Sequence, residues 1–290
     1  MSAVLRVQAL RKCYREFTLN SIDLEVHAGS ILGIIGPNGA GKTTLVKLIM
    51  NQITPDGGTV RVFDLDHASS EKEIKNRVGY VGEQQHFYRR RTVEWTGRFV
   101  ARFFTNWDQD RFESLLEEFG ISRTKRTGQL SKGMKAKLAM AIALSHGAEL
   151  LILDEPTSGL DPIIRREILN ILRDVARDEN RTVILSSHIS EDLSRIADRL
   201  AFMNNGEIIL RGDKEDIFAN WKRIHFREGT LAQSTVDMLA NVQEQQFSNV
   251  GICRDFEMIK PILASGIAGG DVRVENLDID DILISMVNGE

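Results

Sequence analysis

A glycine-rich stretch carries residue types and spacing suited to gripping a phosphate. It reads G-x-x-x-x-G-K-[ST] and comprises Gly36, Pro37, Asn38, Gly39, Ala40, Gly41, Lys42 and Thr43. An apolar run at 31–35 precedes it and a helix-forming run at 44–50 follows it, which is the strand–loop–helix setting that the motif requires. Glycines let backbone N–H groups approach a phosphate without a Cβ in the way, and the helix start adds further donors. We expect Lys42 to reach the β- and γ-phosphates of a nucleotide and Thr43 to give its hydroxyl to Mg²⁺.

Two carboxylates follow a second apolar run. Residues 150–153 are all apolar, and Asp154 and Glu155 come directly after them. Such a strand places Asp154 beside Thr43, where Mg²⁺ needs oxygen ligands. Glu155 can then accept a proton from an attacking water or orient that water. The alternative is a buried strand that ends in two solvated acids, and the phosphate loop upstream argues against it because two complementary parts converge on one chemistry.

A serine before a helix-forming run is a second candidate anion site. Ser131 can cap the helix predicted to continue through 136–144, and Gly133 lies in its first turn. A capped helix start with a nearby glycine can bind an anion. Taken alone, this run is more simply explained as ordinary helix capping.

The elements that position these residues follow an α/β pattern. Residues 3–35 alternate apolar and polar residues, which predicts antiparallel strands ending in the strand of the phosphate loop. Strands then alternate with helices, which indicates a mostly parallel sheet with its phosphate site at the carboxyl ends of the strands. Residues 93–119 place apolar residues at helical spacing. We therefore predict an α/β P-loop NTPase core with a mostly parallel sheet, an N-terminal antiparallel β subdomain, a helical insertion and a small C-terminal α+β extension.

Bulk composition is that of a soluble globular protein. The chain has 290 residues, a net charge of −4 and 42% hydrophobic residues, which allows one large domain or one large and one small, and gives no general affinity for nucleic acid. Cys13 and Cys253 lack metal spacing and form no disulfide framework, which suits a reducing cytosol. The start of the chain is not a signal peptide, and the best membrane-span candidate, 138–153, is interrupted by polar residues. Any membrane role is expected to come through a partner chain.

Five motifs in fixed order resemble the nucleotide-binding subunit of ABC transporters, over roughly residues 4–212. They are the phosphate loop with Thr44, the signature run 130–134, the acidic strand end, the run 158–161 and His188. The resemblance implies ATP and Mg²⁺ as cofactors and two subunits that sandwich two ATP molecules head to tail. It makes residues 1–219 an ATP-binding domain, with a helical subdomain at about 86–147. The α/β sequence pattern weakens near residue 220, which predicts a small accessory domain at residues 220–290.

The resemblance also implies roles for single residues. Ser131 and Gly133 contact the γ-phosphate bound by a neighbouring chain, and Asp161 links the two sites. His188 touches the γ-phosphate and acts with Lys42 and Glu155 in hydrolysis. Tyr14 matches the aromatic residue that stacks on adenine, with a core tyrosine as the alternative.

Two positions depart from the family pattern. The signature has Lys132-Gly133-Met134 where the family usually has Gly-Gly-Gln. The metal-contacting glutamine corresponds to Glu83, although Gln84 and Gln85 follow at once. Both departures resemble the branch that serves separate membrane subunits of export type, including peptide-antibiotic and multidrug exporters.

The resemblance thus implies an ATPase that drives export through a separate transmembrane permease, peripheral on the cytoplasmic face of the cell membrane. Its second ATPase subunit is a copy or a different chain. The aromatic and basic segment 86–95 lies where the family docks its membrane partner, with core aromatics beside a solvated basic face as the alternative. A soluble ABC-type ATPase acting on DNA or ribosomes is disfavoured by the single motif set and short insertion, and no nucleic-acid partner is expected. A degraded regulator is disfavoured by the intact Lys42, Asp154, Glu155 and His188.

Overall fold

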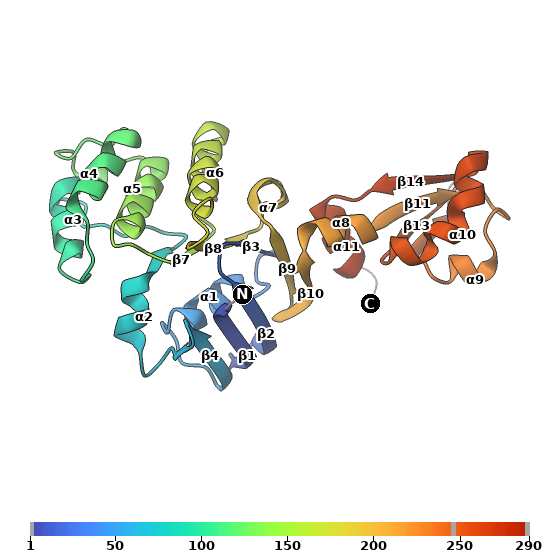
Figure 1. The fold of residues 1–290 in the computed structure, drawn as a ribbon, viewed down its shortest axis with the longest axis horizontal. Coiled ribbons are helices and arrows are strands. Elements are labelled where there is room, and N and C mark those ends of the chain that lie inside the picture. Colours follow the sequence, from blue (N-terminus) through green and yellow to red (C-terminus); the bar gives the residue numbers. More distant parts are fainter. Residues whose placement is uncertain (1–2, 245–247, 288–290) are drawn as a thin grey trace. The chain divides into compact units, whose positions relative to one another are not determined.

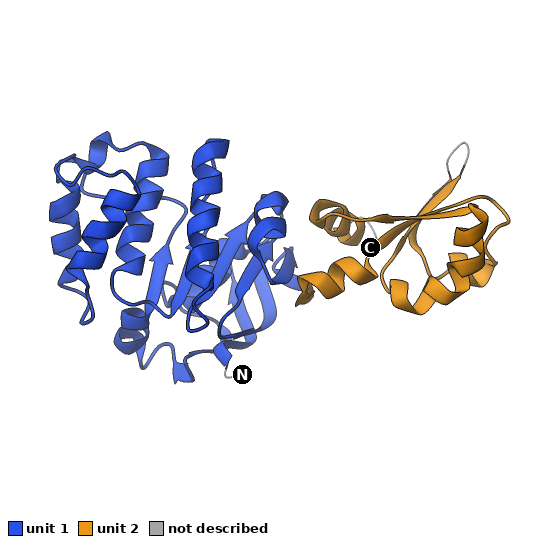
Figure 2. Ribbon diagram, turned by 45° about the horizontal axis from the view of Figure 1, so that its top comes forward, with its two compact units in different colours: residues 1–208 blue, residues 209–290 orange. Residues whose placement is uncertain are grey.

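The computed structural model describes residues 3–244 and 248–287. The chain divides into two compact units, residues 1–208 and 209–290 (Figure 2). The sequence predicts a domain boundary at 219/220, and the compact units divide at 208/209, within strand β10 (Glu207–Asp213), which follows β9 (Arg199–Asn204). Helix α8 (Lys214–Asn220) follows β10 directly, so the break in the sequence pattern lies beyond the structural one.

Two sheets build the first unit (Figure 1). An antiparallel sheet has the order β2-β1-β4-β5, and the second sheet has the order β10-β9-β3-β8-β7-β6. Strands β3, β6, β7, β8 and β9 pair in parallel. Besides β9 and β10, the strands of these sheets are β1 (Ala3–Cys13), β2 (Thr18–His27), β3 (Ile31–Ile35), β4 (Gly57–Val62), β5 (Leu65–Asp66), β6 (Val78–Val81), β7 (Leu150–Asp154) and β8 (Thr182–Ser187).

The position of β3 corrects one prediction. Residues 3–35 were expected to form antiparallel strands throughout, yet β3 lies in the parallel sheet between β8 and β9. All five residues of β3 are buried, as are all those of β7 and β8. Parallel strands covered on both faces lose the apolar–polar alternation that β2 still carries. The mostly parallel sheet and the N-terminal antiparallel subdomain are confirmed.

Helix α1 (Lys42–Ile49) joins the two sheets in one hydrophobic core. Its residues Leu45, Val46 and Leu48 are fully buried against apolar residues of both sheets. Each such side chain contributes about 1.5–3 kcal/mol through its burial. The start of α1, and the phosphate loop before it, are therefore fixed by the core beneath them. Helices α2 (Glu71–Arg77), α6 (Pro162–Ala176) and α7 (Ser190–Ile196) complete this part of the unit.

The predicted helical insertion is confirmed. Helices α3 (Val93–Ala101), α4 (Gln109–Glu118) and α5 (Lys132–Leu144) lie together at one side of the first unit (Figure 1). Each starts with a side-chain cap, supplied by Thr92, Asp108 and Ser131. Beyond α5, the ring of His146 stacks on Phe104 at 3.9 Å between centroids, and its Nε2 lies 3.2 Å from the carbonyl oxygen of Val78 in β6. Among the described residues, no helix is both long and apolar enough to cross a membrane.

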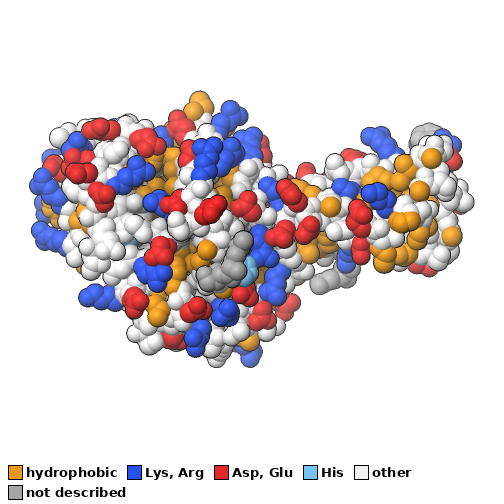
Figure 3. Space-filling view, in the orientation of Figure 1, with side chains coloured by type: hydrophobic (Ala, Val, Ile, Leu, Met, Phe, Trp, Pro, Cys, Tyr) orange, Lys and Arg blue, Asp and Glu red, His pale blue; other side chains and the backbone are white. Residues whose placement is uncertain are grey.

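The second unit is an α+β structure with its own core. A four-stranded antiparallel sheet has the order β12-β13-β11-β14. Its members and helices are β11 (Lys222–Phe226), α9 (Gln233–Val236), β12 (Ala240–Glu244), β13 (Asn249–Cys253), α10 (Phe256–Gly269), β14 (Val272–Asn276) and α11 (Ile279–Val287). Ile259 and Leu263 of α10 belong to one buried apolar cluster with Ile224 of β11. On the other side of α10, Met258 and Ile262 are exposed, and Figure 3 shows hydrophobic side chains gathered on this face of the unit.

Candidate functional site

The phosphate loop connects β3 to α1 and depends on its glycines. Gly39 and Gly41 have φ values of 84° and 106°, which other residues rarely adopt. A Cβ on Gly41 would lie 2.8 Å from the Phe17 ring, and one on Gly36 would lie 2.2 Å from the carbonyl oxygen of Met203. The loop is therefore held against its neighbours too closely for side chains at these positions. Gly41 stands at the N-terminus of α1, whose unpaired N–H groups favour an anion.

An open cavity of about 710 Å³ lies over this loop. It is lined by Glu16, Phe17, Pro37, Asn38, Gly39, Ala40, Gly41, Lys42, Thr43, Thr44, Glu83, Glu155, Ser158 and His188. Its size falls within the range of cavities that hold small molecules and cofactors. Most of the predicted phosphate, metal and catalytic residues thus face one space. Glu16 and Phe17 were not predicted, and Ser158 belongs to the predicted run 158–161 without having been given a role.

Lys42 is buried and already engaged within the loop. Its Nζ donates to the carbonyl oxygens of Gly36 at 2.6 Å and Pro37 at 3.3 Å, and lies 3.3 Å from Oε1 of Glu155. Only 5% of Lys42 is exposed, so its charge is balanced by these oxygens. Phosphate oxygens entering the cavity compete with Glu155 for this ammonium.

Asp154 and Thr43 supply adjacent hard oxygen ligands. The Thr43 hydroxyl donates to Oδ1 of Asp154 at 3.3 Å, and the Ser186 hydroxyl donates to the same oxygen at 2.6 Å. Burial, and then the negative charge of Asp154, raise the pKa of Tyr80, so this phenol stays protonated. Within the described part of the chain, no three His, Cys, Asp or Glu side chains group closely enough to hold a metal ion. This pair fits Mg²⁺, which usually binds one or two carboxylates and completes its shell with phosphate oxygens and waters.

Glu155 is held from several sides in a strained backbone conformation. Its φ is 51°, in the left-handed region, which costs of order 1–3 kcal/mol for such a residue. Its N–H donates to the carbonyl oxygen and hydroxyl of Ser186 at 3.2 and 3.1 Å. Its Oε2 accepts from the backbone N–H of His188 at 3.2 Å and lies 2.7 Å from Nδ1 of that ring. Strain maintained by so many contacts is typical of functional positions.

The residues predicted to meet a neighbouring chain lie outside the cavity. The Ser131 hydroxyl accepts from the N–H of Met134 at 3.2 Å and so caps α5. Gly133 touches α6, since a Cβ there would lie 2.6 Å from Cγ2 of Ile164. Asp161 caps α6 and accepts from the N–H groups of residues 163 and 164, both at 3.1 Å. Within one chain, the structure does not bring these side chains to the phosphate loop.

Phe17, rather than Tyr14, lines the cavity. Tyr14 is 47% exposed, so the alternative of a core tyrosine is wrong. It stacks on Phe17 with ring centroids 6.5 Å apart. The turn between β1 and β2 brings Phe17 to Gly41, a contact for which the sequence carries no local signal. Of the three candidates after β6, Glu83 lines the cavity, whereas Gln85 donates to the carbonyl oxygen of Gly82 at 2.8 Å.

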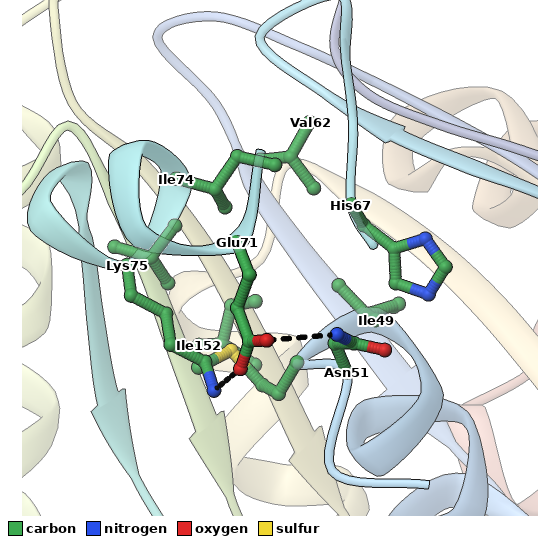
Figure 4. Close-up of a pocket in the computed structure, with 10 residues that line it drawn as sticks. Ile49, Asn51, Val62, His67, Glu71, Ile74, Lys75 and Ile152 are labelled. Carbon is green, nitrogen blue, oxygen red and sulfur yellow. Dashed lines mark hydrogen bonds and ion pairs between the residues drawn. The ribbon is translucent and has the colours of Figure 1, made fainter. Parts of the chain in front are cut away.

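A smaller cavity in the same unit lacks comparable chemistry (Figure 4). Its lining is mostly apolar, and Glu71 there is occupied by Asn51 at 3.2 Å and by Lys75. At about 10 Å³ the cavity has room for one water molecule. His67 is buried with no hydrogen-bond partner at either ring nitrogen, and burial lowers its pKa, which keeps the ring neutral. The large cavity is therefore the candidate site.

Comparisons with known proteins agree with this geometry. A family model described as "ABC transporter" matches residues 19–158. The bacitracin transport ATP-binding protein BcrA of Enterococcus faecalis is 35% identical over 212 residues, which cover 72% of this chain and 69% of BcrA. The uncharacterized ABC transporter ATP-binding protein all4389 of Nostoc sp. is 33% identical over 280 residues, with 83% of each chain covered. The structure of cbiO1 from Clostridium perfringens, described as part of the ABC transporter complex cbiONQ, matches with a TM-score of 0.66 at 27% identity, covering 76% of this chain and 92% of cbiO1.

The family model covers the phosphate loop, the signature run 130–134 and the acidic end of β7. The matched fold is the α/β P-loop core that carries the cavity, and the family prediction is confirmed. ATP binding follows from the family and from the fit of the cavity. The chain belongs to the ABC transporter family, as an ATP-binding subunit that hydrolyses ATP.

Proposed function

We propose that this ATPase works as a dimer whose hydrolysis sites are each completed by the second subunit, and that it drives export through a separate transmembrane permease. The observation that carries the proposal is the distribution of the motifs. The phosphate loop, Glu155 and His188 line one cavity, and Asp154 is bonded to Thr43 of that lining, while the Ser131 helix start is not part of the lining. A helix start that can bind an anion but does not line its own chain's phosphate cavity fits a site shared between two chains.

Within the cavity, each residue has a proposed task. The loop N–H groups and Lys42 bind the phosphates of ATP, and Phe17 lies at the edge of the cavity where a base can stack. Thr43 and Asp154 would hold Mg²⁺, with Glu83 as a further carboxylate, and the bound ion would neutralise phosphate charge. When Lys42 turns to the phosphates, its ion pair with Glu155 is broken. The carboxylate of Glu155 then accepts a proton from the attacking water, or orients that water, while His188 remains bonded to it.

A mixture of two inactive variants tests the shared site. Lys42→Ala abolishes ATP binding by its own loop, and Ser131→Arg blocks the site of the other subunit through steric clash. In a mixed dimer, one site combines both lesions and the other combines the two intact halves. Random pairing therefore restores about a quarter of wild-type hydrolysis, because half of the dimers are mixed and each has one intact site.

Co-assembly of the two variants is measured with two affinity tags in the same samples. Recovery of hydrolysis only in mixed dimers supports the shared site. Mixed dimers without recovery refute it, and so does full activity of Ser131→Arg alone. If ATP produces no dimer from two copies, this chain does not form the site with itself, and the homodimer form of the proposal is wrong.

The membrane partner is proposed to dock on the helical insertion. Four aromatic rings of the insertion lie in contact, those of Tyr88, Trp95, Phe99 and Phe103. Trp95 and Phe99 stack with their centroids 5.1 Å apart, and the rings of Tyr88 and Phe103 lie edge-on to Phe99. Tyr88 and Phe103 are 62% and 66% exposed. Exposed aromatic rings beside arginine, here Arg91 over Trp95 at 4.8 Å, are typical of protein interfaces. The similarity to BcrA, named for bacitracin transport, supports export of a peptide antibiotic or a similar compound.

Retention by membranes tests this part of the proposal. Wild-type protein is expected to co-purify with a transmembrane subunit, and Tyr88→Ala with Phe103→Ala is expected to lose it while nucleotide binding persists. Met258→Ala is the matched control, because Met258 is also exposed, at 57%, but lies in the other unit. Absence of any membrane subunit with the wild-type protein would favour the soluble ATPase alternative.

A further inference from the structure

A buried carboxylate outside the cavity ties together the segments that carry the proposed hydrolytic residues. Asp192 of α7 has no exposed surface. Its Oδ2 accepts from the Thr157 hydroxyl at 2.6 Å, and its Oδ1 accepts from Nε of Arg165. Thr157 lies two residues after Glu155, and Arg165 lies in the first turns of α6. One side chain thus connects α7, the loop after β7 and the start of α6.

The three partners form an enclosed polar cluster. Thr157 is 1% exposed, and the Arg165 side chain is 21% exposed. A buried carboxylate needs a countercharge and hydrogen bonds, and Asp192 obtains both from these two residues. Arg165 also reaches Glu191 at 3.3 Å, but the Glu191 side chain is 59% exposed. Glu191 and Asp192 therefore contact the same arginine, but the Glu191 carboxylate is exposed and that of Asp192 is buried.

We propose that Asp192 is a positioning residue for ATP hydrolysis. His188 lies four residues before it, and both the backbone N–H and the ring of His188 engage Glu155. Thr157 fixes the chain on the other side of Glu155. Asp192 therefore fixes the positions of Glu155 and His188 relative to each other. Through Arg165 it also fixes the start of α6, where Asp161 lies. The inference rests on the proposed function of that site.

Apolar packing keeps α7 in place without this cluster. Leu193 is fully buried and Ile196 is 5% exposed, and a Cβ on Gly33 of β3 would lie 3.0 Å from Leu193. Loss of the Asp192 charge is therefore expected to let the segments that carry Glu155 and His188 shift relative to each other, while α7 stays packed in its place. No atom of the cluster lines the cavity, so ATP binding is expected to persist. This separation distinguishes a positioning role from a general loss of stability.

Asp192→Asn tests the inference, because asparagine keeps the size of the side chain and one acceptor but loses the charge. The expected result is a fall in kcat of about 10- to 100-fold, the cost of misplacing a reacting group by about 1 Å, with the Kd for ATP within about twofold of wild type. Glu191→Gln is the matched control and is expected to keep wild-type kcat. Arg165→Gln alone and combined with Asp192→Asn are expected to give similar losses, because both break the same pair.

Thermal unfolding of every variant and the behaviour of Glu155→Gln complete the experiment. Wild-type kcat in folded Asp192→Asn overturns the inference, and so does a loss equal to that of Glu191→Gln or a parallel loss of ATP affinity. If Glu155→Gln also hydrolyses ATP normally, the proposed function of the site fails as well. If Glu155→Gln is impaired and Asp192→Asn is not, only the positioning role fails.

Discussion

Glu155→Gln separates the proposed proton acceptor from the binding machinery around it. Glutamine keeps the size of the side chain and can still accept a hydrogen bond, but it cannot take a proton from water. Loss of proton transfer costs about 10²- to 10⁴-fold in kcat, equivalent to about 3–5 kcal/mol of activation free energy. Glu155 is 7% exposed, and its Oε2 lies 2.7 Å from Nδ1 of His188.

The same change is expected to preserve or strengthen ATP binding. The wild-type carboxylate lies 3.3 Å from the Lys42 ammonium and competes with phosphate for it. In the variant without nucleotide, Lys42 loses its ion pair with Glu155 but keeps the carbonyl oxygens of Gly36 and Pro37. The free energy of unfolding is therefore expected to fall by about 1–3 kcal/mol. Because ATP then displaces no ion pair, its Kd is expected to stay equal or decrease.

Single-turnover hydrolysis and nucleotide binding measured on the same samples provide the assay. Glu149→Gln is the matched control, because Glu149 precedes the other end of β7 and pairs with Arg77 at 2.6 and 2.8 Å. This pairing lowers the pKa of Glu149, but the residue lies outside the cavity, so the control is expected to turn over normally. Turnover of Glu155→Gln within about threefold of wild type would remove Glu155 from the chemical step, since general base catalysis contributes more than that.

Three further predictions concern the cavity rim, the metal and pH. Phe17→Ala is expected to weaken ATP binding by about tenfold through lost stacking, with a smaller effect for Tyr14→Ala, and equal effects in a fluorescent-nucleotide titration would contradict the placement of Phe17. Glu83→Gln is expected to raise by about tenfold the Mg²⁺ concentration needed for half-maximal binding of a non-hydrolysable ATP analogue, and an unchanged Mg²⁺ titration would exclude Glu83 from the metal site. Burial lowers the pKa of His146, so the unfolded chain binds the proton more tightly and stability falls as pH drops below about 6.5. His146→Gln is expected to flatten that part of the pH dependence in urea unfolding at pH 5 and 7.5, and an unchanged slope would assign the effect to other groups.

The sequence was most informative where function requires a fixed local geometry. The loop 36–43 and the acidic end of β7 could be placed because their spacing and flanking strands admit one arrangement. The Asn205-Gly206 pair between β9 and β10 is of the same kind, because an Asn-Gly pair is typical of a tight hairpin and both residues have the positive φ that such a hairpin needs. These features depend on neighbours in sequence.

Features that depend on distant neighbours could not be predicted. Phe17, in the turn between β1 and β2, packs against Gly41 of the phosphate loop, and no sequence pattern in either segment predicts this contact. Asp192 and Thr157 are 35 residues apart, and each looks like an ordinary polar residue near a helix or turn. The division of the compact units at 208/209 falls within β10, and no pattern in that strand marks it, whereas the sequence pattern changes only near residue 220.

His146 connects the helical insertion to strand β6 of the catalytic core. The ring is pressed on Phe104 and joined to Val78, and the strand that begins at Val78 leads within a few residues to Glu83 at the cavity. If the permease docks on the outer helices as proposed, a movement of those helices would act through His146 and β6 on the segment that carries Glu83. A nucleotide that displaced Glu83 would act on the helices along the same contacts in the opposite direction.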